Sequence, residues 1–532
     1  MGRCLSALFF ALLFFFKFIS SVFSTCALSK RDPLHLKSTL NLSLRSDPLT
    51  LDPRKNSDGV TSQFLMFLYE GLTEIGEDKQ VKMAIASNIE ASKDFTEYLI
   101  TIKRLFWSNG EVLTAHDFKR SWLEILSPAF GAYNPDYFFN IKNAKAIYLQ
   151  DKLPEEFGVE VLDEKTFKVL LERPDPYFPE LLSNKHFFPV HPSVSYAKSP
   201  NQLLVFPGPF CIEKWLHQNK IDLKLNLFHR NYENARIDLV EFMILEEEHL
   251  QLDLFEQGKL DWIGAPFSTL SLDAMQYLRQ HPCFRVFETP SLYYFTLNLE
   301  VYPLQHQKLR KALALAIDRQ SLIQDVLGGQ ELPAFAFLPP QMHALSRSYF
   351  QEDLLLAKEL LAQALEDLHL SLDTFPTITL KYPSLQLSHL IAQAVQQQWK
   401  QHLGIHVHLQ NSHWHGFLSD LQHKKYHIAA LGKGTHVLDP YYFLVPYHRK
   451  NQPMNRCGYE NVLFAKVLDQ LKHEPSAQRR LELVETAESV LMEDMPMIPL
   501  FFQKNYCLVN KKLKNIQISP LGQVRLSESY FD

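Results

Sequence analysis

The pattern of apolar and polar positions predicts two strands in the first fifth of the chain. Residues 40–44 are strand-like and lead into an Asp-Pro pair, a dipeptide that favours turns. Residues 98–103 place Tyr98, Ile100 and Ile102 at every second position, which is the period of a strand with one buried face. We therefore expect both segments to be strands, the second lying with one face on a core.

A turn and a helix are expected directly after the second strand. Asn109 and Gly110 both tolerate positive φ, as tight turns require. Thr114, with Asp117 three positions later, resembles the capping box that starts a helix. Apolar residues then follow at helical spacing, namely Phe118, Trp122 and Ile125. A hairpin followed by a helix is typical of an α+β or α/β domain.

Strands and helices alternate in the C-terminal third. In chain order, the strand-like and helix-like segments are residues 377–382, 388–403, 405–409, 416–423 and 427–431. This alternation predicts a parallel sheet with right-handed crossovers, and Gly404 supplies a helix stop. Ligands of such sheets bind at the carboxyl ends of the strands. The loop of residues 432–440, directly after the third strand, is therefore the first candidate for a binding site.

Length and composition describe a folded protein with room for several domains. The chain has 532 residues, of which 46% are hydrophobic and 21% are charged, values far from those of disordered chains. The formal charge is −5 and the basic residues are scattered, which argues against a nucleic-acid partner. Glycine-rich phosphate-binding and dinucleotide-binding motifs are absent. We expect no nucleotide chemistry and no cofactor.

The N-terminus has the layout of an export signal. Arg3 precedes an apolar run over residues 5–16 and a small-residue stretch over residues 20–27. This arrangement is typical of a secretory signal peptide and is too short to span a bilayer as a mature helix. We expect residues 1–25 to be a signal peptide and the protein to be exported to the periplasm or cell envelope.

The cysteines leave two questions open. Residues 25–27 resemble a cleavage site, whereas residues 23–26 resemble a degraded lipoprotein box in which Cys26 would be acylated and tether the protein to a membrane. Four later cysteines have a spacing that fits neither a metal site nor a redox motif. These are Cys211, Cys283, Cys457 and Cys507. They are expected to be core residues, with disulfides as the open alternative.

Several short motifs, in the same order along the chain, resemble one known family. The segment 86–122, which contains Trp-Ser-Asn-Gly at residues 107–110, resembles the signature of the bacterial family 5 extracellular solute-binding proteins, the oligopeptide, dipeptide and nickel binding group. Further matching blocks are residues 51–53, 69–72, 207–210, 258–261, 310–319 and 496–500. Together these blocks cover nearly the whole mature chain.

The resemblance implies an α/β fold, a large two-lobed periplasmic binding protein of type II with an extra domain inserted in lobe 1. Lobe 1 would comprise residues 26–72 with 188–290 and 503–532, the inserted α+β domain residues 73–187, and lobe 2 residues 291–502. It also implies a monomer that is not an enzyme and that delivers its solute to transmembrane ABC permease subunits. A ligand that contacts both lobes would favour the closed state by hinge closure.

Recognition of the ligand departs from the family pattern. Peptide binders of this family carry an acid a few residues after the strand-ending glycine, and that acid pairs with the α-ammonium group of the peptide. Here His436 holds that position, Asp439 comes three residues late, and Ala430 stands where oligopeptide binders can have arginine. Trp414 does match the tryptophan that lines the family's ligand chamber.

The candidate ligand-binding residues come from this comparison and from the topology. They are Thr61, Ser62, Tyr133, Trp414, Gly432, Lys433, Gly434, His436 and Asp439. Core packing or plain loop surface is the alternative for each of them. Four nearby histidines invite a metal site, namely His406, His408, His413 and His415. Because the alternating residues Ile405, Val407 and Leu409 form the opposite, apolar face, His406 and His408 are expected to point to water, and we expect no metal.

Three functions follow from these observations. The first is capture of oligopeptides. The second is the same fold binding another solute, such as a modified or amine-blocked peptide or a nickel chelate, because the usual acid is missing at His436. The third is a secreted hydrolase, but neither a G-x-S-x-G elbow nor an H-E-x-x-H helix is present. The sequence therefore favours a binding protein.

Overall fold

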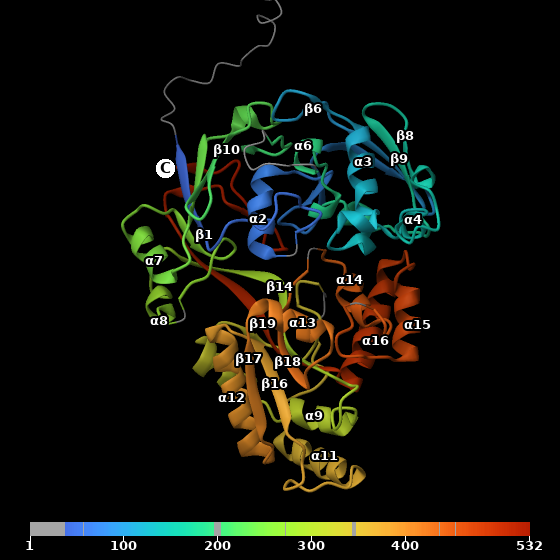
Figure 1. The fold of residues 1–532 in the computed structure, drawn as a ribbon, viewed down its shortest axis with the longest axis vertical. Helices are drawn as coiled ribbons and strands as arrows, with labels where there is room; N and C mark the ends of the chain where they lie inside the picture. Colours follow the sequence, from blue (N-terminus) through green and yellow to red (C-terminus); the bar gives the residue numbers. More distant parts are fainter. Residues whose placement is uncertain are drawn as a thin grey trace, which may run out of the picture.

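The computed structural model describes residues 38–56, 58–195, 204–271, 273–342, 347–435, 437–452 and 454–532. The expected signal peptide, Cys26, His436 and the side chain of His415 lie outside this description. The described chain forms two lobes, and the C-terminus returns to the first of them (Figure 1).

The first lobe contains a four-stranded sheet built from distant parts of the chain. Its order is β1-β12-β11-β10, with β1 parallel to β12 and the other pairs antiparallel. Helix α2 packs its aromatic side chains on this sheet, with the Phe64 and Phe67 rings each 5.2 Å from the Phe242 ring. The bounds are β1 Thr39–Leu44, α2 Gly59–Leu68, β10 Phe210–Leu216, β11 Lys220–Leu225 and β12 Leu239–Ile244. The predicted strand at 40–44 is confirmed as β1.

A second unit of the first lobe surrounds the antiparallel sheet β4-β5-β9-β8. Its elements are β4 Ala86–Ala91, β5 Glu97–Ile102, β6 Leu105–Phe106, β7 Val112–Leu113, α3 Ala115–Ile125, α4 Ala144–Tyr148, β8 Val159–Val161, β9 Thr166–Leu170 and α5 Phe178–Leu181. The sequence predictions hold in this unit. Tyr98, Ile100 and Ile102 are the buried residues of β5, and the backbone N–H of Thr114 donates to Asp117 Oδ2 at 2.9 Å where α3 begins.

The second lobe is organised around a mixed sheet of order β13-β19-β14-β18-β16-β17. Its edge strand β13 (Trp262–Gly264) comes from the first lobe, and the short strand β15 (Leu332–Pro333) pairs with β19. Strands β16, β17 and β18 are parallel, as the sequence predicts, and α12 and α13 connect them. Gly404 ends α12 with a φ of 71°. The bounds are β16 Ile378–Pro383, α12 Gln386–Leu403, β17 Val407–Ser412, α13 Trp414–Gln422 and β18 Ile428–Lys433.

Two long antiparallel strands run between the lobes (Figure 1). In β14 (Phe284–Leu297) and β19 (Met497–Val509), the segment around Leu292 and Phe502 belongs to the core of the second lobe. The other end of β19, around Cys507, belongs to the core of the first lobe. These strands are therefore the covalent connection about which the lobes can move.

Helices surround the sheet of the second lobe, and the helices labelled α14, α15 and α16 lie on its side towards the first lobe (Figure 1). The bounds are α9 Gln307–Leu315, α11 Leu354–Asp367, α14 Pro440–Leu444, α15 Val462–Leu471 and α16 Ala477–Asp494. One hydrophobic core consists only of residues between 292 and 502. A second core consists of residues between 72 and 205, with Val437 as its one buried member from the second lobe among the described residues. Val437 thus leaves its own lobe and packs into the core of the other.

Candidate functional site

The end of β18 meets the first lobe near the predicted binding loop. The strand continues to Lys433, because Lys433 pairs with Leu292 of β14. The prediction that Gly432 and Lys433 are loop residues is therefore wrong, and the loop begins at Gly434. Gly432 and Gly434 are exposed, and a β-carbon on Gly432 would lie 3.3 Å from Gln503 Oε1. Small residues leave the backbone open at the carboxyl end of this strand.

Lys433 has no carboxylate partner among the residues that the structure describes. Its ammonium nitrogen lies 4.8 Å from the centre of the Phe443 ring, a cation–π arrangement. Burial, together with the positive charge of Arg456, lowers the pKa of Lys433 to about 8. The ammonium form therefore still predominates at neutral pH.

Asp439 has partners inside the protein. It caps α14 by accepting a hydrogen bond from the backbone N–H of Tyr441 at 2.9 Å, and it forms an ion pair with Arg480 of α16. Both side chains are at least nine-tenths buried. This arrangement makes Asp439 a structural anchor of the loop, and its contact with a ligand stays a prediction.

The loop after β18 docks on the inserted unit of the first lobe. The backbone N–H of Leu438 donates to Glu180 Oε1 at 2.7 Å, and the guanidinium carbon of Arg480 lies 4.3 Å from the centre of the Tyr177 ring. We call the following five residues the interlobe cluster: Asp175, Tyr177, Glu180, Asp439 and Arg480. Burial and the charge of Asp439 raise the pKa of Glu180 to about 7 and that of Asp175 to about 6.

Trp414 is the first residue of α13 and is 54% exposed. The Phe417 ring lies 6.1 Å from the Trp414 ring between centroids. An exposed indole beside a strand end offers a flat apolar surface for a ligand. Contact of Trp414 with a ligand stays a prediction.

Thr61 and Ser62 lie in the first turn of α2, and their contact with a ligand stays a prediction. The helix begins here because Asp58 accepts a hydrogen bond from the backbone N–H of Thr61 at 2.7 Å. Thr61 is 3% exposed. The Ser62 hydroxyl donates to Asn56 Oδ1 at 2.7 Å and accepts from the ammonium of Lys185. Both hydroxyls are thus used within the first lobe.

Lys185 is a buried lysine that the sequence analysis did not single out. Burial lowers its pKa to about 7, and its ammonium group donates hydrogen bonds to Asn56 and Ser62.

Tyr133 is 47% exposed, and its backbone N–H donates to the carbonyl oxygen of Arg54 at 3.1 Å. Contact of Tyr133 with a ligand also stays a prediction.

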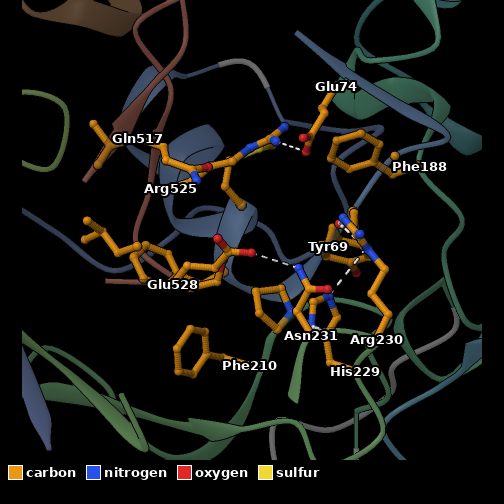
Figure 2. A pocket seen from close by; sticks show the side chains of 18 of the residues that line it. Tyr69, Glu74, Phe188, Phe210, His229, Arg230, Asn231, Gln517, Arg525 and Glu528 are labelled. Carbon is orange, nitrogen blue, oxygen red and sulfur yellow. Dashed lines mark hydrogen bonds and ion pairs between the residues drawn. The ribbon is translucent and has the colours of Figure 1, made fainter. Parts of the chain in front are cut away.

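A polar cavity of about 180 Å³ lies within the first lobe, under the C-terminal segment (Figure 2). Glu70 accepts hydrogen bonds from Arg230, Glu74 pairs with Arg525, and Asn231 donates to Glu528 at 3.0 Å. Burial alone would raise the pKa of Glu70, but His229 and Arg230 hold it at about 2. The ion pair of Arg525 and the hydrogen bond of Glu528 hold the C-terminal segment against the first lobe. The acids and arginines that line the cavity neutralise one another.

Neither histidine spacing nor cysteine spacing produces a site. His406 and His408 are exposed, as predicted, and the described residues contain no group of three or more possible metal ligands. The four later cysteines are free thiols, with Cys457 and Cys507 buried, which answers the question of disulfides. Within the ranges that the structure describes, no helix has the length and apolar character needed to cross a membrane.

Comparison with known proteins gives a consistent result. Residues 80–455 match the family model described as bacterial extracellular solute-binding proteins, family 5 Middle. The oligopeptide-binding protein OppA of Bacillus subtilis (strain 168) is 31% identical over 506 residues, which cover 93% of this chain and 93% of that protein.

Solved structures resemble the whole described fold. A periplasmic oligopeptide-binding protein of Borrelia burgdorferi (OppAIV) has a TM-score of 0.82 at 26% identity, and the match covers 93% of this chain and 100% of that one. The murein tripeptide binding protein MppA of Escherichia coli has a TM-score of 0.81 at 26% identity, with 93% and 98% covered.

Proposed function

The chain belongs to the bacterial extracellular solute-binding proteins of family 5, and we propose that it captures oligopeptides between its lobes and passes them to an ABC permease. The observation that carries this proposal is the open carboxyl end of β18, where exposed Gly432 and Gly434 are followed by a loop that contacts Glu180 of the first lobe through Leu438. Relatives that are named oligopeptide-binding proteins and that match this chain over almost its whole length support it. A nickel chelate is not favoured, and no reaction step is assigned to the protein.

The experiment that tests this function is ligand capture followed by hinge closure. The purified protein is stripped of bound material by partial unfolding, and the released molecules are identified by mass spectrometry. Peptides are expected. Returning a recovered peptide should reduce the radius of gyration in small-angle X-ray scattering, because a ligand that touches both lobes favours the closed state. Recovery of no peptide, together with no peptide binding in calorimetry, would refute the proposal.

We propose the following division of the chain: residues 26–72 with 188–290 and 503–532, an inserted domain at 73–187, and a second lobe at 291–502. The separate hydrophobic cores support these bounds. We further propose that the protein acts as a monomer and delivers its ligand to transmembrane ABC permease subunits; the relatives named as oligopeptide-binding proteins support the permease partner.

We propose export through residues 1–25 and a lipid anchor at Cys26. In the native host or a bacterial expression host, wild-type protein should fractionate with membranes, whereas the Cys26→Ser variant should be released into the soluble envelope fraction. Equal release of both proteins would contradict the anchor and would indicate simple signal cleavage. Cys283→Ser, a change far from the N-terminus, is the control and should fractionate as wild type.

A further inference from the structure

Two turns with exposed apolar side chains lie side by side in the first lobe. Leu227 and Phe228 form the turn after β11 and are 64% and 46% exposed. The hairpin of β6 and β7 carries Phe106 and the exposed Val112, and the Phe106 and Phe228 rings are 6.5 Å apart between centroids. Figure 1 shows β6 at the end of the first lobe that is remote from the second lobe. We call the residues Phe106, Val112, Leu227 and Phe228 the apolar tip.

The turn that carries Leu227 and Phe228 is fixed by a buried asparagine. The side-chain amide of Asn226 donates to the carbonyl oxygen of Gly208 at 2.8 Å, and its side-chain oxygen accepts from the backbone N–H of Phe228 at 3.0 Å. The Phe228 ring lies against Gly110, where a β-carbon would be 3.2 Å from it. Two large apolar side chains are thus held in an exposed position, which favours their burial against a partner.

The start of the described chain lies beside the apolar tip. The carbonyl oxygen of Ser38 accepts from the backbone N–H of Asp238 at 3.1 Å, and that of Asp238 accepts from Leu225 at 2.9 Å. Ser38 is therefore two backbone hydrogen bonds away from the strand end that leads into Leu227. Twelve residues, 38 minus 26, separate it from Cys26, a length of chain that reaches at most about 40 Å. An acyl group at Cys26 would keep the apolar tip close to a bilayer.

The chemistry of the apolar tip fits the boundary between lipid headgroups and acyl chains. Aromatic and aliphatic side chains enter this region from proteins that lie on a membrane, and basic side chains beside them contact anionic lipids. Arg104 is exposed, and its guanidinium carbon lies 5.8 Å from the centre of the Phe106 ring. The tip therefore combines apolar groups that a bilayer can bury with a cation that can pair with a headgroup phosphate.

We propose that the apolar tip rests on the bilayer to which Cys26 tethers the chain, with Leu227 and Phe228 inserted at the level of the headgroups. The inference rests on the proposed lipid anchor and does not depend on which solute is captured. A weak apolar contact is sufficient, because the tether makes it intramolecular. The whole tip belongs to the first lobe, so the second lobe stays free to move about β14 and β19.

Tryptophan fluorescence on vesicles tests the contact directly. The mature chain, residues 26–532, carries an N-terminal hexahistidine tag, which replaces the acyl group. The tag holds the protein on vesicles of phosphatidylethanolamine, phosphatidylglycerol and a nickel-chelating lipid. In Leu227→Trp, brominated lipids should quench most of the added fluorescence, and the emission should shift to shorter wavelength. Leu355→Trp, on α11 of the second lobe and 83% exposed, is the control and should not be quenched.

Removing the apolar side chains tests how much the contact contributes to binding. Leu227→Ser combined with Phe228→Ser should weaken binding of the tagged protein to these vesicles about tenfold or more, because the burial of two large apolar side chains is lost. Leu354→Ser combined with Leu355→Ser, two exposed leucines of the second lobe, should bind as wild type. Since Phe228 also packs on Gly110, Leu227→Ser alone is the second variant and should weaken binding about threefold or more.

The failure of this inference differs from the failure of the lipid anchor. Unchanged emission of Leu227→Trp on vesicles, or equal vesicle binding of the tip variants and wild type, overturns the bilayer contact while the anchor at Cys26 stands. A dimer in analytical ultracentrifugation that disappears in Leu227→Ser with Phe228→Ser assigns the tip to a second copy of the chain and also overturns it. Equal release of wild type and Cys26→Ser in fractionation overturns the anchor and the tethered contact with it.

Discussion

Replacing Arg480 by methionine should lower the free energy of unfolding by about 3–5 kcal/mol, the usual cost of leaving one member of a buried ion pair alone. The side chains of Arg480 and Asp439 are 9% and 5% exposed. Without the guanidinium, the Asp439 carboxylate would face Asp175 and Glu180, whose pKa values it already raises. The loop after β18 would then lose its ion pair with α16, and α16 would lose its cation–π contact with Tyr177 of the inserted unit.

Thermal and denaturant unfolding of matched variants measure this effect. Arg479→Met removes the neighbouring arginine, which pairs with Glu482 at the exposed surface, and it should change stability by no more than about 0.5 kcal/mol. Adding Asp439→Asn to Arg480→Met should restore part of the loss, because the unpaired charge is gone and asparagine still caps α14. Equal stability of the two arginine variants would contradict the role of the ion pair.

Peptide affinity should fall about tenfold between pH 5 and pH 8 because of Glu180. Burial and the charge of Asp439 raise the pKa of Glu180 from 4.5 to about 7 where the lobes meet, against the opposing effect of the Leu438 backbone N–H. The other charged and titratable groups that interact with it are Tyr177 and Arg480, and Asp175 interacts with the same Asp439 and Arg480. Separation of the lobes returns Glu180 to water.

The sign follows from the raised pKa. The closed arrangement binds the Glu180 proton more tightly than the open one, so the contribution to closure is fully present below about pH 4.5 and is lost as the pH rises through about 7. Asp175, with its pKa raised to about 6, acts in the same direction over a lower range. Acid therefore favours the closed, ligand-holding state.

Two glutamate variants test whether Glu180, and not another titratable group, causes the pH dependence of peptide affinity. Glu180→Gln should flatten most of the change in affinity for a peptide with neutral side chains, since glutamine cannot lose a proton. Glu155→Gln, an exposed glutamate of the same unit, should keep the wild-type dependence. Calorimetry at three pH values compares them, and an unaltered slope in Glu180→Gln would assign the dependence to another group.

Local sequence patterns were sufficient to predict the elements that are stabilised by residues close to one another in the chain. The period of two in β5, the capping box of α3 and the stop at Gly404 each depend on residues within a few positions of one another. Their physical causes are side-chain alternation, capping of free backbone N–H groups and the left-handed conformation of glycine. The parallel arrangement of β16, β17 and β18 also follows, because short crossover helices permit little else.

Tertiary contacts decided the details of the candidate site. The extension of β18 to Lys433 comes from its pairing with Leu292, and the burial of Thr61 comes from the packing of α2. Neither contact has a local signature. The sequence pattern therefore placed the loop correctly in the topology but misplaced its first residues.

By itself, the sequence determined the family, the alternation of strands and helices and the general position of the binding loop. Only the tertiary structure decided which charges have partners. Glu180 meets Leu438 across 258 positions of the chain, whereas Lys433 meets no carboxylate among the described residues. The physical reason is that electrostatic energy depends on distance and burial, which the folded arrangement sets and the order of residues does not.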